Sequence, residues 1–395
     1  MRTYRELFGA PEFTPLFLAS AGQVAAQTVG GLALGTLVFA ATGSPLLSGL
    51  AMFGPALGQV AGAMTLLSAA DRLPPRASLA GLALLAGFGT AVLAVPGLPV
   101  WAVLAVVLGQ GVFACLGGGV RYGLLNELLT AEGYLLGRSA LNMASGVVQI
   151  AGFAIGGGLV HVLSPRGTLL AAAALYALTA AVAALGLTGR GPRATGRPSP
   201  AQTWRNNALL WSERPRRRVY LALWLPNGLI VGCESLFIPY APEHAGLLFA
   251  CAASGMLAGD ILAGRFLPPA WRLRLVAPLY LLLAAPYVIV ALGQGVPVAA
   301  AAIAVASVGY AATLLLQERL MALTPTELSG HALGLHSSGM ITTQGLAAAL
   351  AGALAEYLTP ATAMGVLAVA SAALTLALGV PGGAARPRVR GRSRL

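Results

Sequence analysis

Long apolar stretches dominate this sequence, and they make a lipid bilayer its natural surroundings. An α-helix rises about 1.5 Å per residue, so about 20 apolar residues cross the roughly 30 Å hydrocarbon core of a membrane. Only 9% of the 395 residues are charged, whereas a soluble domain carries about 25%. The sequence therefore predicts an all-α membrane protein with twelve transmembrane helices, at about 15–41, 45–69, 78–96, 99–119, 140–163, 167–188, 219–240, 244–263, 275–293, 297–317, 333–356 and 361–380.

The arginines set the expected orientation. If the N-terminus lies inside, every arginine except Arg166 falls on the inner side. Positive charge is retained on the cytoplasmic face during insertion. The chain contains no lysine and is rich in alanine and glycine, which is typical of GC-rich bacterial coding. We therefore expect a multi-pass protein of the bacterial inner (plasma) membrane with both termini cytoplasmic.

Other function classes find little support. The net charge of +12 could suggest nucleic-acid binding. However, the arginines lie between apolar stretches and in the tail, not on a basic domain with interleaved aromatics. The sequence has no H-E-x-x-H motif, no G-x-x-x-x-G-K-S/T phosphate loop and no cysteine pair spaced for a metal. We expect no nucleic-acid partner, no metal, no cofactor and no enzyme activity.

A long polar break divides the twelve stretches into six plus six, and the two sets repeat. Leu73-Pro74-Pro75 recurs as Leu267-Pro268-Pro269, and Gln149 recurs as Gln344, at an offset of about 195 positions. Such a repeat predicts two pseudo-symmetric six-helix bundles that rock about a central seam. The expected divisions are a first bundle at 1–188, a cytoplasmic linker at 189–218, a second bundle at 219–380 and a basic cytoplasmic tail at 381–395.

The linker itself contains one helical pattern. Ser199-Pro200 has the form of a helix start, and Trp204, Ala208 and Trp211 share one face of the helix that would follow. This favours an interfacial helix beneath the bilayer. The alternative is a plain flexible linker.

Twelve spans, cytoplasmic ends and basic turns after spans two and eight resemble the major facilitator superfamily. The family's turn after span two reads G-x-x-x-D-R-x-G-R. Asp71, Arg72 and Arg76 fit it approximately, with Leu67 and Pro74 at its glycine positions. The resemblance implies a latch that closes the inner face through charge-assisted hydrogen bonds, with Asp260 and Arg265 as its counterpart in the second half. The alternative is a solvated charge pair, which contributes little.

Span five carries the finer resemblance. Residues 152–157 keep the glycines of the antiporter signature G-P-x-x-G-G but not its proline, and Arg138-Ser139-Ala140-Leu141-Asn142 resembles the start of span five in macrolide and siderophore exporters. In span four, Val107 precedes Gln110-Gly111, and the membrane-embedded arginine that the family places before Gln-Gly is absent. The resemblance implies a proton-coupled drug antiporter, an efflux protein of the kind that confers drug resistance.

Polar residues inside the spans are the candidates for a substrate and ion path, because such groups usually face the bundle interior. The alternative for each is a hydrogen bond that holds helices together. Glu234 follows the interruption Pro226-Asn227-Gly228 and could take up a proton or bind a cation, or it could lie near the outer surface. His336 could titrate or be a buried, hydrogen-bonded histidine. The candidates are Gln23, Gln27, Asn142, Gln149, Asn227, Glu234, His336 and Gln344.

These features together predict a secondary active transporter that exports a small amphipathic drug or secondary metabolite by alternating access. We recognise no arginine at mid-depth in the spans, which favours apolar cargo. The alternatives are symport uptake of a small polar metabolite and a non-transporting membrane receptor or scaffold. The expected partners are a small-molecule substrate, protons or another coupling ion, and the lipid bilayer, with the protein itself a monomer.

Overall fold

The computed structural model describes residues 4–65, 73–191, 200–325 and 328–379. These residues are almost entirely helical. The elements are α1 (Tyr4–Phe8), α2 (Phe13–Thr42), α3 (Pro45–Thr65), α4 (Pro75–Leu93), α5 (Val100–Leu128), α6 (Ala131–Gly186), α7 (Pro200–Ser212), α8 (Arg214–Ser235), α9 (Phe237–Tyr240), η2 (Pro242–His244), α10 (Ala245–Phe266), α11 (Pro269–Ala291), α12 (Val296–Val308), α13 (Ala311–Ala322), α14 (Ser329–Ala355) and α15 (Pro360–Ala377).

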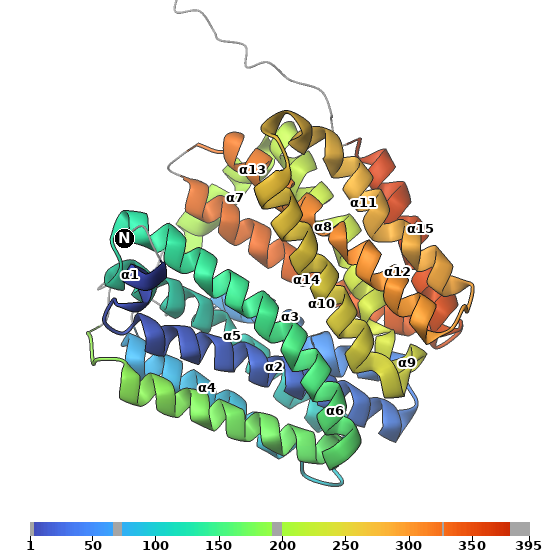
Figure 1. The fold of residues 1–395 in the computed structure, drawn as a ribbon, viewed down its shortest axis with the longest axis horizontal. Helices are drawn as coiled ribbons and strands as arrows, with labels where there is room; N and C mark the ends of the chain where they lie inside the picture. Colours follow the sequence, from blue (N-terminus) through green and yellow to red (C-terminus); the bar gives the residue numbers. More distant parts are fainter. Residues whose placement is uncertain (1–3, 66–72, 192–199, 326–327, 380–395) are drawn as a thin grey trace, which may run out of the picture.

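The predicted number of membrane crossings is confirmed. The described residues contain 11 helices long and apolar enough to span a membrane, and one of them covers 51 residues. That length amounts to about 75 Å, more than twice a hydrocarbon core. Ser164 breaks this helix with φ 67° and ψ 163°, and its Oγ accepts the Gly167 N–H at 3.4 Å. The α6 ribbon reverses direction (Figure 1), so it supplies two antiparallel crossings and the total is twelve.

The two halves repeat the same helix pairings. In the first half α2 packs against α6, α3 against α5, and α4 against α6. In the second half the corresponding crossings pair in the same way, with α8 against α14 and α15, α10 against α12, and α11 against α15. The fold is therefore two pseudo-symmetric six-helix bundles (Figure 1).

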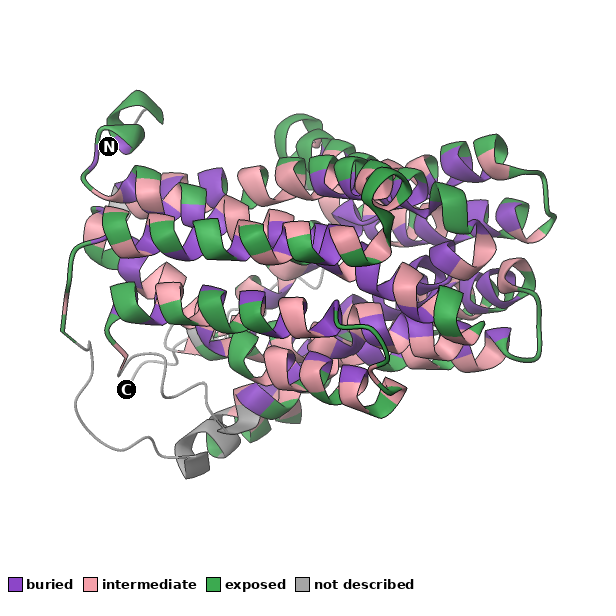
Figure 2. Cartoon of the chain, turned by 90° about the horizontal axis from the view of Figure 1, so that it is seen from below, coloured by how far each residue is buried: buried purple, intermediate pink, exposed green. Residues whose placement is uncertain are grey.

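Large apolar side chains cover the outward helix faces. Phe88, Trp101 and Leu185 are 71%, 73% and 85% exposed. Figure 2 shows exposed residues along the outer sides of the helices as well as in the connecting loops. Exposed apolar surface on this scale is expected where lipid, rather than water, surrounds the protein.

The halves meet along two helix pairs, α3 against α14 and α6 against α10. We call the bundle ends on the side of α1 and α7 the inner ends and the opposite ends the outer ends. The rings of Phe153 on α6 and Phe249 on α10 stack with centroids 4.7 Å apart. Nearer the outer ends, Gly157 and Gly246 bring the α6 and α10 backbones into direct contact. The contacts described here thus join the bundles through their outer halves.

The helix predicted in the linker is present as α7. Trp211 near its end stacks on Trp224 of α8, with ring centroids 5.7 Å apart, which fastens the helix to the second bundle. The side chain of Trp204 lies outside the described part. Helix α8 begins at Arg214, ahead of the predicted bundle boundary at 219.

The bundles differ in their interiors. A continuous core fills the second bundle, and Tyr220, Tyr280, Tyr287 and Phe237 are completely buried in it. The first bundle has smaller separate clusters. This difference leaves room for a cavity along the axis of the first bundle.

Candidate transport cavity and polar clusters

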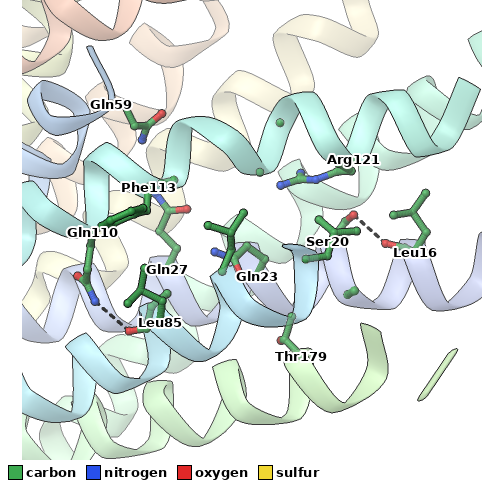
Figure 3. A pocket seen from close by; sticks show the side chains of 17 residues that line it. Leu16, Ser20, Gln23, Gln27, Gln59, Leu85, Gln110, Phe113, Arg121 and Thr179 are labelled. Atoms are coloured by element: carbon green, nitrogen blue, oxygen red, sulfur yellow. Dashed lines mark hydrogen bonds between the residues drawn. The ribbon is translucent and has the colours of Figure 1, made fainter. Parts of the chain in front are cut away.

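A cavity of about 300 Å³ lies inside the first bundle, between α2, α3, α4, α5 and the second part of α6. Two predicted path residues, Gln23 and Gln27 on α2, line it (Figure 3). A smaller pocket of about 90 Å³ shares these two residues and continues toward Leu93 at the outer end of α4. Gln23 and Gln27 thus lie together on one wall of the cavity, and their role in a substrate path stays a prediction.

The cavity wall carries two further glutamines that were not among the sequence candidates, Gln59 of α3 and Gln110 of α5. Gln110 is held in place because its Nε2 donates to the Ala86 carbonyl at 2.8 Å. The amides of Gln23, Gln27 and Gln59 make no hydrogen bond within the described ranges. These three amides are thus available to a bound molecule.

Arg121 of α5 lies at the inner end of the cavity, and its guanidinium points into it beside Ser20 (Figure 3). The Ser20 hydroxyl is occupied, since it donates to the Leu16 carbonyl at 2.7 Å. Arg121 forms no ion pair or hydrogen bond with other described residues. Sequence analysis placed Arg121 in an inner loop, but α5 continues to Leu128. Arg121 therefore belongs to the inner end of a membrane helix rather than to a loop, and it reaches the cavity from there.

Three of the predicted path residues form polar contacts inside the second bundle and do not line the cavity. The Gln344 amide of α14 donates to Asn227 Oδ1 of α8 at 3.1 Å. The His336 ring lies 3.0 Å from Gln317 Nε2, and its backbone carbonyl accepts the Trp224 indole N–H at 3.0 Å. These contacts fit the alternative of interhelical hydrogen bonds.

Glu234 is enclosed in the second bundle near the outer end of α8 and is 8% exposed. The Tyr310 hydroxyl donates to its Oε1 at 2.9 Å. Tyr310 lies at the junction between α12 and α13, and no arginine in the described ranges pairs with the carboxyl. The carboxyl thus lies near the outer end, as the alternative expected, but it is buried rather than exposed. Ser235, the next residue, packs against Gly49 of α3, so Glu234 lies beside the contact between the halves.

The two candidates on α6 stand apart from the cavity. Asn142 is exposed and accepts a hydrogen bond from the Tyr122 hydroxyl at 3.2 Å. Gln149 is half-buried. Neither residue is part of the cavity wall.

The predicted inner latch is only partly visible. Asp71 and Arg72 lie outside the described residues, and Arg76 is exposed at the start of α4. Asp260 and Arg265 are both exposed and form no ion pair with each other. Arg265 instead lies over the Phe266 ring, 6.0 Å from its centroid.

A different ionic contact lies at the inner end of the first bundle. Glu12, just before α2, accepts hydrogen bonds from the two terminal guanidinium nitrogens of Arg190 at 2.8 and 2.9 Å and from the Thr188 N–H at 2.9 Å. Burial alone would raise the pKa of Glu12, but the hydrogen bonds from Thr188 and Arg190 outweigh it and hold the pKa below its ordinary value. This contact ties the beginning of α2 to the chain that leaves α6.

At the outer ends a carboxylate joins the two halves. Glu356, directly after α14, accepts a hydrogen bond from the Ser44 hydroxyl at 2.5 Å and from the Leu46 N–H at 3.3 Å. Ser44 directly precedes α3 and Leu46 lies in its first turn, where unpaired N–H groups favour a negative charge. We call this contact the outer latch. The Ser44-Pro45 helix start was visible in the sequence, but its partner from the other half was not.

Comparison with known proteins supports the fold. No protein-family profile and no curated protein matches the chain. Solved structures do match it, among them a nucleoside transporter, NupG, at TM-score 0.74 and 13% identity, covering 93% of this chain and 98% of that one. A POT family transporter solved with a thioalcohol-conjugated peptide matches at TM-score 0.73 and 12% identity, covering 94% and 98%.

A third match is a bacterial homologue of the human lysosomal transporter Spinster in an inward-facing, occupied conformation. Its TM-score is 0.67 and its identity 14%, covering 93% of this chain and 96% of that one. Identities this low establish the fold alone. The chain has the fold of major facilitator transporters.

Proposed function

We propose that this protein is a secondary active transporter that exports a small amphipathic drug or secondary metabolite in exchange for protons. The observation that carries the proposal is a pair of matched bundles that touch along α3 and α14 and along α6 and α10, with a cavity lined in part by glutamines inside the first bundle. We place the protein in a bacterial plasma membrane as a monomer, with both termini cytoplasmic. The exporter branch rests on the sequence resemblance of span five.

Alternating access follows from the kind of contact between the halves. Small residues at Gly157 and Gly246 let the helices approach closely, and separating these helices would also part the stacked rings of Phe153 and Phe249. Rocking the bundles would open the outer ends and close the inner ends. Asp71, Arg72, Arg76, Asp260 and Arg265 are our candidates for a latch that forms in that opposite state.

Glu234 is our candidate for the proton carrier. Its carboxyl is buried, has one hydrogen bond from Tyr310 and has no cationic partner in the described part of the chain. Gaining a proton would remove its charge and change its hydrogen bonding. Because Ser235 touches Gly49 across the halves, that change would occur next to the surfaces that must separate.

Symport uptake of a polar metabolite is the second candidate function. Arg121 and the glutamines of the cavity favour it, because polar cargo needs hydrogen-bonding partners once water is removed. Direction of transport distinguishes the two functions directly.

The test is an accumulation screen of small organic compounds in a host that lacks its own efflux pumps, with and without a protonophore. Export predicts that cells carrying the protein retain less of a cargo compound and that the protonophore abolishes the difference. Glu234→Gln should lose this proton-driven difference, while Glu243→Gln, at an exposed outer glutamate, should keep it. Higher retention in carrying cells would support uptake instead. Normal efflux and pH dependence in Glu234→Gln would reject Glu234 as the proton carrier.

A further inference from the structure

We propose that the cavity of the first bundle binds an amphipathic organic monoanion, with Arg121 holding its charged end. This inference rests on the proposed transport function and names the chemical class of the cargo. It starts from the position of Arg121, about two helical turns before the end of α5 at Leu128. A guanidinium cannot lose its proton in a protein, so its charge requires a partner or water.

No such partner exists among the described residues. The described residues of the cavity wall include no aspartate or glutamate, and Arg121 has no ion pair or hydrogen bond in the described ranges. Its side chain extends into the cavity and not toward the outside of the bundle (Figure 3). An unpaired guanidinium aimed into a cavity favours an anion there, since charge-assisted hydrogen bonds to a carboxylate are among the strongest polar contacts.

The rest of the cavity fits an amphipathic body attached to that anion. Gln23 and Gln27 extend from α2 beyond Ser20, at a helical spacing that places them in line along the cavity. Their amides can bond to ether, carbonyl or hydroxyl groups of a ligand. The lining also includes apolar side chains, among them Leu82, Leu85 and Phe113. A volume of about 300 Å³ lies at the small end of ligand pockets.

The single positive charge sets the selectivity. A cation would be repelled by Arg121, and a neutral molecule would leave the guanidinium without a counter-charge. A dianion would bring one charge more than the cavity balances. A monocarboxylate or similar monoanion with an apolar body matches the site best.

A charge series tests this on the purified full-length protein in nanodiscs of neutral lipid. The probes are 4-phenylbutyrate, its neutral amide 4-phenylbutyramide and the cation 4-phenylbutylamine. Dissociation constants are measured by calorimetry and checked by the shift in melting temperature. We expect the anion to bind at least about 10-fold more tightly than the other two. Equal binding of the three probes would overturn the proposal.

Two substitutions locate the binding. Arg121→Gln should weaken binding of the anion by about 10-fold or more and leave binding of the amide unchanged, whereas Arg121→Lys should retain part of the preference. Arg274→Gln, which removes an exposed arginine of α11, is the matched control. Should Arg121→Gln fail to fold, the wild-type charge series and Arg121→Lys still decide the question. Wild-type anion binding in Arg121→Gln would contradict the assignment.

The same experiment separates this inference from the proposed function. Stabilisation by anionic phospholipid alone, dependent on Arg121, would identify a lipid site and reject an anionic cargo. Proton-driven efflux of neutral or cationic compounds that 4-phenylbutyrate does not inhibit would leave the transporter standing and overturn the cargo class. Arg121-dependent binding without any transport would instead confirm the site and refute the transport function.

Discussion

The contact between Gly157 and Gly246 offers the sharpest test of whether the two bundles move against each other. A methyl group on Gly246 would lie 2.7 Å from Gly157 Cα and 2.8 Å from the Phe153 carbonyl oxygen. Ordinary contacts of a Cβ atom are 3.4–4 Å, so the overlap approaches about 1 Å. Both obstacles are backbone atoms, so a change of rotamer cannot relieve it. Gly246→Ala therefore forces α10 away from α6.

The free-energy cost of Gly246→Ala is that of overpacking a tight contact, about 1–3 kcal/mol. This cost applies only when the outer ends are closed, because the two helices separate in the opposite state. The equilibrium between the states should therefore shift toward the outer-open state by about 5- to 150-fold. A shift of this size is large enough to populate a conformation that is minor in the wild type.

The measurement is the distance between spin labels on the outer ends of the two bundles. Val95 and Leu292 are suitable positions because they are 52% and 68% exposed. The labels are attached after replacement of the native cysteines, in a background that still transports. We expect Gly246→Ala to add a population at longer distance. Gly158→Ala should not, because a Cβ at Gly158 meets nothing within 4 Å. Unchanged distances in a folded Gly246→Ala protein would refute the movement of α6 and α10.

Two further substitutions give smaller, independent effects. Glu356→Gln removes the negative charge of the outer latch from the start of α3, so the same label pair should report a shift toward the outer-open state of about two- to fivefold. No shift would mean that the latch does not stabilise closure. Glu12→Gln weakens the contact with Arg190 and Thr188 and should lower stability at neutral pH by about 1.5–3 kcal/mol. The native pKa of Glu12 is lowered, so its contribution is complete above the unfolded-state pKa and disappears as pH falls through the native pKa. Melting curves of wild type and variant should therefore converge in acid, and a constant difference would contradict this role.

The membrane fold was predictable because many separate stretches of the sequence each indicate it. Each apolar stretch is separately long enough to cross a bilayer, and the predicted spans 140–163 and 167–188 are divided where the structure breaks α6, at Ser164. Gln23 and Gln27 were predicted as path residues because their spacing places them on one helix face, and both line the cavity. Gln59 and Gln110 carried the same signal, a polar side chain within an apolar span, but they lack a polar neighbour at helical spacing.

The contacts between residues far apart in the chain could not be derived from one sequence, because they depend on how each helix is rotated toward its neighbours. Gln344 meets Asn227 from 117 positions away, and Glu356 reaches Ser44 across 312. No local pattern specifies such pairs. Arg121 was misplaced for a simpler reason. The apolar stretch ends near residue 119, but helix α5 continues to Leu128, which carries Arg121 to the cavity wall.

Secondary active transport is tested most directly by moving a compound against its own gradient with purified protein. The protein is reconstituted into liposomes, a pH gradient is imposed without ATP, and the internal concentration of a compound from the efflux screen is followed against protein-free liposomes. We predict net accumulation that exceeds the protein-free control and collapses when a protonophore removes the gradient. Equal distribution in both kinds of liposome, or accumulation that survives the protonophore, would contradict proton-driven transport.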